Sequence, residues 1–142
     1  MAFGAWRAVI MSTNNAGRFV MLVNISLGAL AVVFGALGSH LSIQSIDLNS
    51  LNSFEIAQKY HMFHVVVVLI EGLMIDIGFR DLFIKISMVL FLLGVFCFCG
   101  SLYSLFFFRV DYLDFLTPIG GFFFLTGWVA FFSAFVTREK IV

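Results

Sequence analysis

Four long apolar segments separated by short polar loops occupy most of this sequence. The first, residues 19–40, is long enough as a helix to cross a hydrocarbon core of about 30 Å at about 1.5 Å per residue. We predict three more helices at residues 53–79, 82–108 and 117–136. A chain of 142 residues that is 62% hydrophobic and 11% charged cannot hide so much apolar surface in one soluble core. Lipid must therefore solvate much of it.

The predicted fold is an all-α, integral membrane four-helix bundle in a single domain, residues 19–136. Residues 137–142 form a C-terminal tail. Residues 1–18 are interpreted as a frayed N-terminal tail, with a short interfacial helix or a remnant of a targeting sequence as alternatives. Eight basic and eight acidic residues give no net charge, so the composition carries no polybasic signal for nucleic acid.

Four crossings place both tails on one side of the membrane, and the basic residues indicate which side. Cytoplasmic loops of membrane proteins carry an excess of lysine and arginine. The side that holds both tails has six of the eight basic residues, and the other side has two. This distribution predicts that both termini are inside (N-in/C-in). The six are Arg7, Arg18, Arg80, Lys85, Arg138 and Lys140, and the two are Lys59 and Arg109.

The topology brings unusual polar residues from separate helices to the outer end of the bundle. Unpaired polar groups in hydrocarbon cost at least about 1–3 kcal/mol each, so they should face inward and meet. We predict a structural polar cluster, hydrogen-bonded just below the outer surface. Its members are His40, Tyr60, His64, Ser101 and Tyr103.

His61 and Glu71 are candidates for an intramembrane contact or a proton site, because ionisable groups in membrane segments mark such sites. Tyr60, His64 and Glu71 share one helical face, but Asp76 lies about 140° further round and breaks the line. A protonated Glu71, a bond to a neighbouring helix, or contact with a partner subunit is therefore favoured over a proton path.

The pair His61-x-x-His64 could form half of a metal site, since residues at i and i+3 share a helix face. A zinc site would need His40 or a carboxylate to complete four ligands. The spacing is short and common, so structural histidines are favoured. No catalytic, cofactor-binding or metal residue is predicted.

Glycines recur at intervals along the predicted helices, as in membrane helices that pack closely. We predict that they serve packing within the bundle, with the binding of another protein as the alternative. The glycines are Gly35, Gly38, Gly94, Gly100, Gly120, Gly121 and Gly127.

Several ordered motifs resemble those of the YgdD family, small four-helix proteins of the bacterial inner membrane with mitochondrial relatives. The resemblance spans about residues 28–128 and implies the fold and an inner-membrane location, bacterial or mitochondrial. It implies no biochemical activity, and the family pattern gives no role to His61 or Glu71. The motifs are FGALGSH (Phe34–His40), Tyr60 with His64, GSLY (Gly100–Tyr103), and TPIGG (Thr117–Gly121) followed by Gly127 and Trp128.

The sequence favours a non-enzymatic protein that acts by association with other membrane proteins, for example as an accessory subunit of a larger inner-membrane complex such as a respiratory one. This interpretation rests on the abundant packing surface, the single modest polar cluster, and loops that are too short for a soluble catalytic site. The alternative is a small transporter, a proton path, or a quinone- or metal-binding protein that uses His40, Tyr60, His64 and Glu71.

Overall fold

The computed structural model describes residues 15–41, 48–79, 81–109 and 111–138. Within these ranges the regular structure is helical and contains no strand. Two long helices, α2 (Asn15–Leu41) and α3 (Leu48–Asp76), come first. A continuous rod follows, made of α4 (Leu82–Gly94), the π-helical segment η1 (Val95–Cys99) and α5 (Gly100–Phe108). A short 3-10 turn, η2 (Asp111–Leu113), leads to α6 (Leu116–Arg138). The all-α prediction is confirmed.

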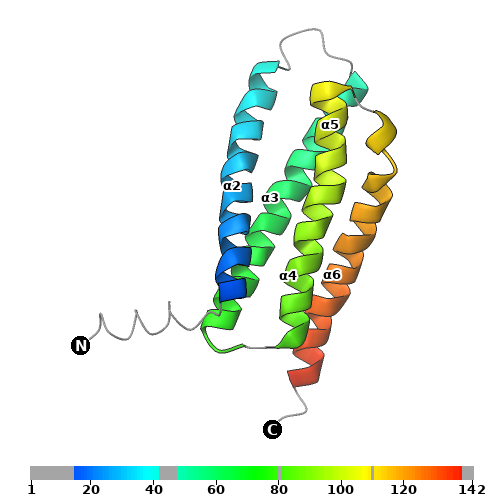
Figure 1. Ribbon diagram of the computed structural model, residues 1–142. Coiled ribbons are helices and arrows are strands. Elements are labelled where there is room, and N and C mark those ends of the chain that lie inside the picture. The colour runs from blue at the N-terminus through cyan, green and yellow to red at the C-terminus, as the bar shows by residue number, and fades with distance from the viewer. Residues whose placement is uncertain (1–14, 42–47, 80, 110, 139–142) are drawn as a thin grey trace, which may run out of the picture.

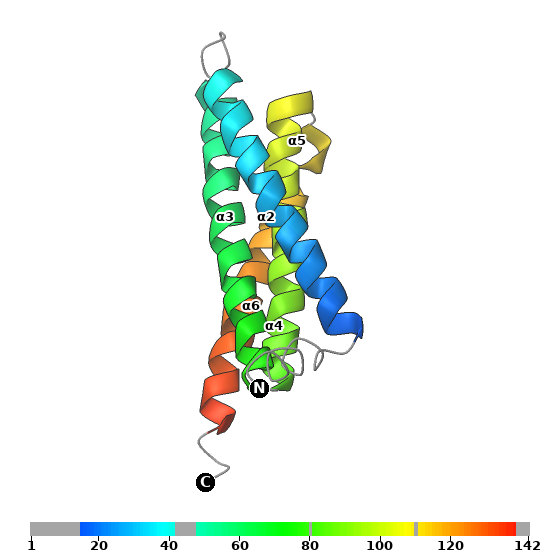
Figure 2. The same ribbon diagram turned by 90° about the vertical axis from the view of Figure 1, so that its left-hand side faces the viewer.

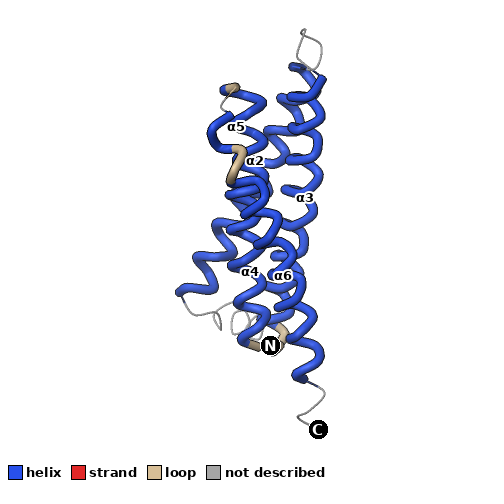
Figure 3. The backbone as a smooth tube through the Cα atoms, turned by 90° about the vertical axis from the view of Figure 1, so that its right-hand side faces the viewer, coloured by secondary structure: helices blue, strands red, loops and turns tan. Residues whose placement is uncertain are grey.

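The helices run alternately up and down, so the beginning of α2 and the end of α6 lie at the same end of the bundle (Figure 1). The turned view shows that α2 crosses α3 at an angle and diverges from the rest at its N-terminal end (Figure 2). The tube view shows the other helices running along a common direction (Figure 3). α3 is central, since it packs against α2 on one side and against α4, η1 and α5 on the other. α6 packs mainly on α4 and η1.

Three helical stretches in the described part of the chain are long and apolar enough to cross a membrane. They are Gly17–Gly38, Leu82–Phe108 and Leu116–Thr137. α3 is not among them, and its apolar part contains Lys59, His61, His64 and Glu71. Within the described residues the structure therefore has four long helices, counting the rod as one, and three apolar candidate spans, and the crossing by α3 stays a prediction.

The start of α3 differs from the predicted one. α3 begins at Leu48 rather than at residue 53, so Asn52 and Glu55 lie within the helix. The added turn is stabilised by apolar packing: Leu51 is partly buried, and Phe54 is 4% exposed among the aromatic rings of α5.

The end of α3 is a Schellman motif, which satisfies the last carbonyl groups of a helix. The Gly78 N–H donates to the Ile75 carbonyl oxygen, and the Phe79 N–H donates to that of Met74. Gly78 has φ +102°, a left-handed conformation that favours glycine. Helix α4 then begins with the Asp81 carboxylate accepting from the Phe83 N–H at 2.6 Å.

The apolar core lies where α3 meets the rod of α4, η1 and α5. Val68, Ile84 and Phe91 are fully buried there, and Val95 is 4% exposed. Large side chains on the outward faces of α2 and α6 remain exposed, such as Leu22 at 62% and Phe132 at 70%. That distribution fits a protein whose outer surface is solvated by lipid.

Candidate functional site

Tyr103 on α5 lies at the centre of a hydrogen-bonded network that links three helices. Its hydroxyl donates to Gln58 Oε1 at 2.9 Å, and Gln58 Nε2 donates to the Ala31 carbonyl oxygen of α2 at 2.7 Å. His61 Nδ1 lies 3.3 Å from the same hydroxyl. Since the Tyr103 hydroxyl donates its one proton to Gln58, it acts as the acceptor toward His61, and the His61 Nδ1–H donates to the tyrosine oxygen.

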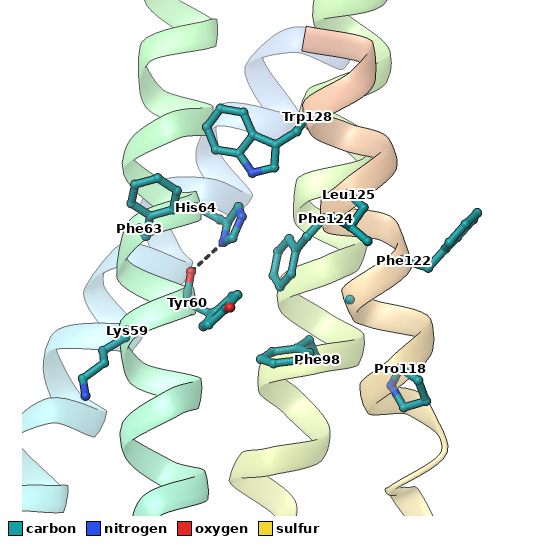
Figure 4. Close-up of a pocket in the computed structure, with 11 residues that line it drawn as sticks. Lys59, Tyr60, Phe63, His64, Phe98, Pro118, Phe122, Phe124, Leu125 and Trp128 are labelled. Atoms are coloured by element: carbon teal, nitrogen blue, oxygen red, sulfur yellow. Dashed lines mark hydrogen bonds between the residues drawn. The ribbon is translucent and has the colours of Figure 1, made fainter. Parts of the chain in front are cut away.

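His64 points toward α6. Its Nδ1–H donates to the Tyr60 carbonyl oxygen at 2.8 Å, one turn earlier in the same helix (Figure 4). The imidazole stacks on Phe124 of α6, with ring centroids 3.7 Å apart and planes 10° apart. Its Nε2 is buried and has no hydrogen-bond partner.

Ser101 makes a third polar contact, between α5 and α6. Its hydroxyl lies 2.6 Å from that of Thr117 and also donates to the Phe98 carbonyl oxygen at 2.9 Å. This contact fixes the N-terminal end of α6 against the rod.

Glu71 is fully buried and accepts a hydrogen bond from the Ser87 hydroxyl of α4. The Ser87 hydroxyl also contacts the Ile84 carbonyl oxygen at 2.9 Å. The second carboxyl oxygen of Glu71 is buried and unpaired. Of the alternatives predicted for Glu71, the structure shows a bond to a neighbouring helix of its own chain.

The predicted polar cluster is distributed over separate contacts rather than gathered in one layer. Tyr103 bonds to Gln58 and His61, while His64 bonds to the Tyr60 backbone and Ser101 bonds to Thr117. The divergence has a geometric cause: His61 and His64 lie about 60° apart around α3, so His61 meets Tyr103 of α5 while His64 meets Phe124 of α6. The side chain of His40 lies outside the described residues.

Sequence reasoning missed the central partner, Gln58, and also Ser87. Gln58 had a usable signal: it lies three residues before His61 on the face of α3 that meets α2. Asn24 of α2 is buried in the bundle, and its side-chain amide donates to the Val65 carbonyl oxygen at 3.0 Å.

The glycines differ in what surrounds them. A Cβ at Gly120 would overlap the Phe98 backbone, and one at Gly38 would overlap the Phe54 ring. At Gly100 and Gly121 a Cβ would meet nothing within 4 Å, so close packing does not apply to these two. At the remaining predicted positions an added Cβ would lie 2.5–3.0 Å from a neighbouring side chain; these positions are Gly35, Gly94 and Gly127.

A groove of about 900 Å³ runs between α3 and α6. Lys59 lies at one end and Trp128 at the other, and His64 is part of the wall between them (Figure 4). The aromatic residues that line it are Tyr60, Phe63, Phe98, Phe122, Phe124 and Trp128. Within the described part of the chain no three histidine, cysteine, aspartate or glutamate side chains gather as a metal site would require.

The family described as "Protein of unknown function (DUF423)" matches residues 34–121. The chain belongs to the DUF423 family. A UPF0382 membrane protein of Haemophilus influenzae is 34% identical over 114 residues, which cover 80% of this chain and 89% of that protein. The UPF0382 inner membrane protein YgdD of Escherichia coli K12 is 30% identical over 112 residues, covering 78% and 84%. The UPF0382 membrane protein SAB0533 of Staphylococcus aureus is 35% identical over 113 residues, covering 77% and 91%. No solved structure matches the chain.

These findings confirm the resemblance to the YgdD family and agree with the three apolar spans. This DUF423 chain is a multi-pass membrane protein, and its location fits that of relatives named inner membrane proteins. The DUF423 match contains all of α3, the rod and the start of α6. It therefore includes the Gln58–Tyr103–His61 network and the part of the α3–α6 groove that lies nearest Lys59 and Pro118.

Proposed function

We propose that this DUF423 protein is non-enzymatic and acts by lateral association with another membrane protein, for example as an accessory subunit of a larger inner-membrane complex. The observation that carries the proposal is that the other helices bury less of α2 than of the rod. In the most apolar stretch of α2, only 17% of the residues are buried within the chain, against 44% in that of the rod of α4, η1 and α5.

The exposed face of α2 has the composition of a membrane helix contact. Ser26, Ala29, Val33 and Ala36 are all exposed and follow one another at intervals of three or four residues. All but Val33 are small residues, and small residues on one helix face let a second helix backbone approach closely, which is how helices associate in lipid. The glycines Gly28, Gly35 and Gly38 face α3 instead, so this outward face is distinct from the internal seam.

The proposed topology has α3 as a fourth crossing with both termini inside. Support comes from the position of α3 between α2 and the rod, with its ends at the two ends of the bundle (Figure 1). Glu71 and His61 are turned inward, which removes most of the cost of placing them at membrane depth.

Association is tested by the native mass of the protein extracted in patches of its own membrane. We expect a species heavier than the free chain, and we expect Ala29→Phe to reduce it several-fold by blocking close approach. The matched control is Val129→Phe, on an exposed part of α6 (66% exposed), which should leave the mass unchanged. A free monomer in the wild type, or equal effects of the two substitutions, would contradict the proposal.

A ligand-binding role is the second candidate, and the specific observation that favours it is the α3–α6 groove beside His64. Transport or proton conduction through Glu71 is a separate branch of that alternative. A flux in proteoliposomes that Glu71→Gln abolishes would favour this branch over association.

A further inference from the structure

The α3–α6 groove combines aromatic walls with one buried polar atom that has no partner. His64 is 2% exposed, and its Nε2 makes no hydrogen bond in the described structure. Buried polar atoms are paired in the large majority of cases, so an exception requires an explanation.

The hydrogen bond on the other ring nitrogen defines what Nε2 needs. Because Nδ1 carries the proton that is donated to the Tyr60 carbonyl oxygen, Nε2 of the neutral ring carries a lone pair and is an acceptor. A complementary ligand must therefore bring a hydroxyl or N–H donor. An acyl chain of a phospholipid has none.

The position of the groove requires a lipid-soluble ligand. Its lining on α6 runs from Pro118 to Trp128, which is about 15 Å of helix, and α6 is one of the apolar spans. The groove thus extends from near the end of the span to its middle. Its volume of about 900 Å³ lies within the usual range for small-molecule sites, roughly 300–1,000 Å³.

The aromatic lining favours a flat ring over a flexible chain. Tyr60 and Phe98 lie with ring centroids 4.9 Å apart, and Phe98 and Phe124 lie 5.7 Å apart. These are the distances at which aromatic rings attract one another, so the wall offers ring faces and edges against which a further ring can pack. Lys59, at one end of the groove, already forms an ion pair with Glu55 at 3.6 Å. This end of the groove therefore does not require the anionic headgroup of a ligand as a partner for Lys59.

We propose that the groove binds a planar, hydroxyl-bearing ring on an apolar tail, the chemistry of a membrane quinol. The ring lies against the aromatic wall, and one hydroxyl donates to His64 Nε2. Figure 4 shows the indole nitrogen of Trp128 on the side of its ring that faces His64. Trp128 is 38% exposed, and the proposal requires its indole to move aside so that the hydroxyl reaches the buried Nε2.

The test measures equilibrium binding to the full chain in phosphatidylcholine nanodiscs under anaerobic conditions. The probes are a decyl-tailed benzoquinol and the matching benzoquinone, which lacks the hydroxyl donor. The readout is Trp128 fluorescence in a Trp6→Phe background, which leaves a single tryptophan of the two. We expect saturable quinol binding about tenfold tighter than quinone binding, the equivalent of one hydrogen bond.

Three variants make the test specific. His64→Leu should reduce quinol affinity about tenfold and leave quinone affinity unchanged. Gly121→Leu should block both ligands, because this residue lines the groove and has open space around it. The matched control is Gly100→Leu, at a glycine that is equally open but lines a different groove, between α2 and α5.

Equal affinity for the quinol and the quinone would overturn the inference, as would wild-type binding by Gly121→Leu. Displacement of the quinol by equimolar phosphatidylglycerol would also overturn it, since the groove would then be a lipid site. The inference does not rest on the association proposed for α2, and the native mass of the same variants tests that proposal separately.

Discussion

The Tyr103 hydroxyl lies where α2, α3 and α5 meet, and its two hydrogen bonds close a network whose last acceptor is a backbone carbonyl. Its ring is packed as well, 4.6 Å from the Phe34 ring and 5.5 Å from the Phe54 ring between centroids. Removal of the hydroxyl alone therefore separates the polar contribution from the apolar one.

We predict that Tyr103→Phe lowers the free energy of unfolding by about 1–2 kcal/mol, because Gln58 and His61 each lose a buried partner. The measurement is an SDS titration in mixed micelles. Tyr112→Phe is the control, at a side chain that is 77% exposed, and should change the free energy by less than about 0.5 kcal/mol. Equal changes in the two variants would show that the network does not stabilise the fold.

The sequence predicted that polar residues of the membrane helices face inward, but it did not predict their partners. His61 and His64 are three residues apart, yet one meets Tyr103 and the other meets Phe124. Which of them faces which neighbour depends on the rotation of α3 about its axis. That rotation decides that Gln58 and Ser87 become hydrogen-bond partners and which aromatic ring packs on each histidine. A pattern of polar residues in the sequence does not determine the rotation.

At the scale of elements, the π-helical segment η1 is the feature that shapes the rod. π-helical turns within α-helices are rare and occur frequently at functional sites. η1 contributes Phe98 to the α3–α6 groove and Cys99 to the groove between α2 and α5. Gly120 of α6 packs directly against the Phe98 backbone, so α6 is seated on this segment.

The adjacent glycines Gly120 and Gly121 offer a matched pair of substitutions. Gly120→Ala should destabilise the fold by about 1–3 kcal/mol, because the added methyl group overlaps the Phe98 backbone. Gly121→Ala has open space and should stabilise by up to about 1 kcal/mol through helix propensity. Thermal unfolding in detergent measures both, and a loss of stability in Gly121→Ala would refute the packing described for this pair.

The helices themselves were largely predictable, because long apolar runs and the turn at Gly78 mark them in the sequence. The bounds of the rod agree with the predicted 82–108. The π segment was not predictable from a 3.6-residue period, which assumes an uninterrupted α-helix. The early start of α3 was missed because its polar first turns are held by the burial of Phe54, a tertiary effect.

At the scale of the whole molecule, the antiparallel arrangement predicts that both tails face the same compartment (Figure 1). With α3 as a crossing, we expect reporters fused before Met1 and after Val142 to be cytoplasmic by the positive-inside rule. A single cysteine introduced at the exposed Asn52 should react with a membrane-impermeant thiol reagent added from outside, in a background without Cys97 and Cys99. Reporters on opposite sides would exclude the fourth crossing.

Elements that are consecutive in the chain pack against one another: α2 against α3, α3 against the rod, and the rod against α6. A growing polypeptide can therefore complete each interface as soon as the next segment leaves the insertion machinery, without waiting for a distant partner. α6, the last to emerge, finds its seat on η1 already formed. The order of synthesis and the order of assembly coincide in this architecture.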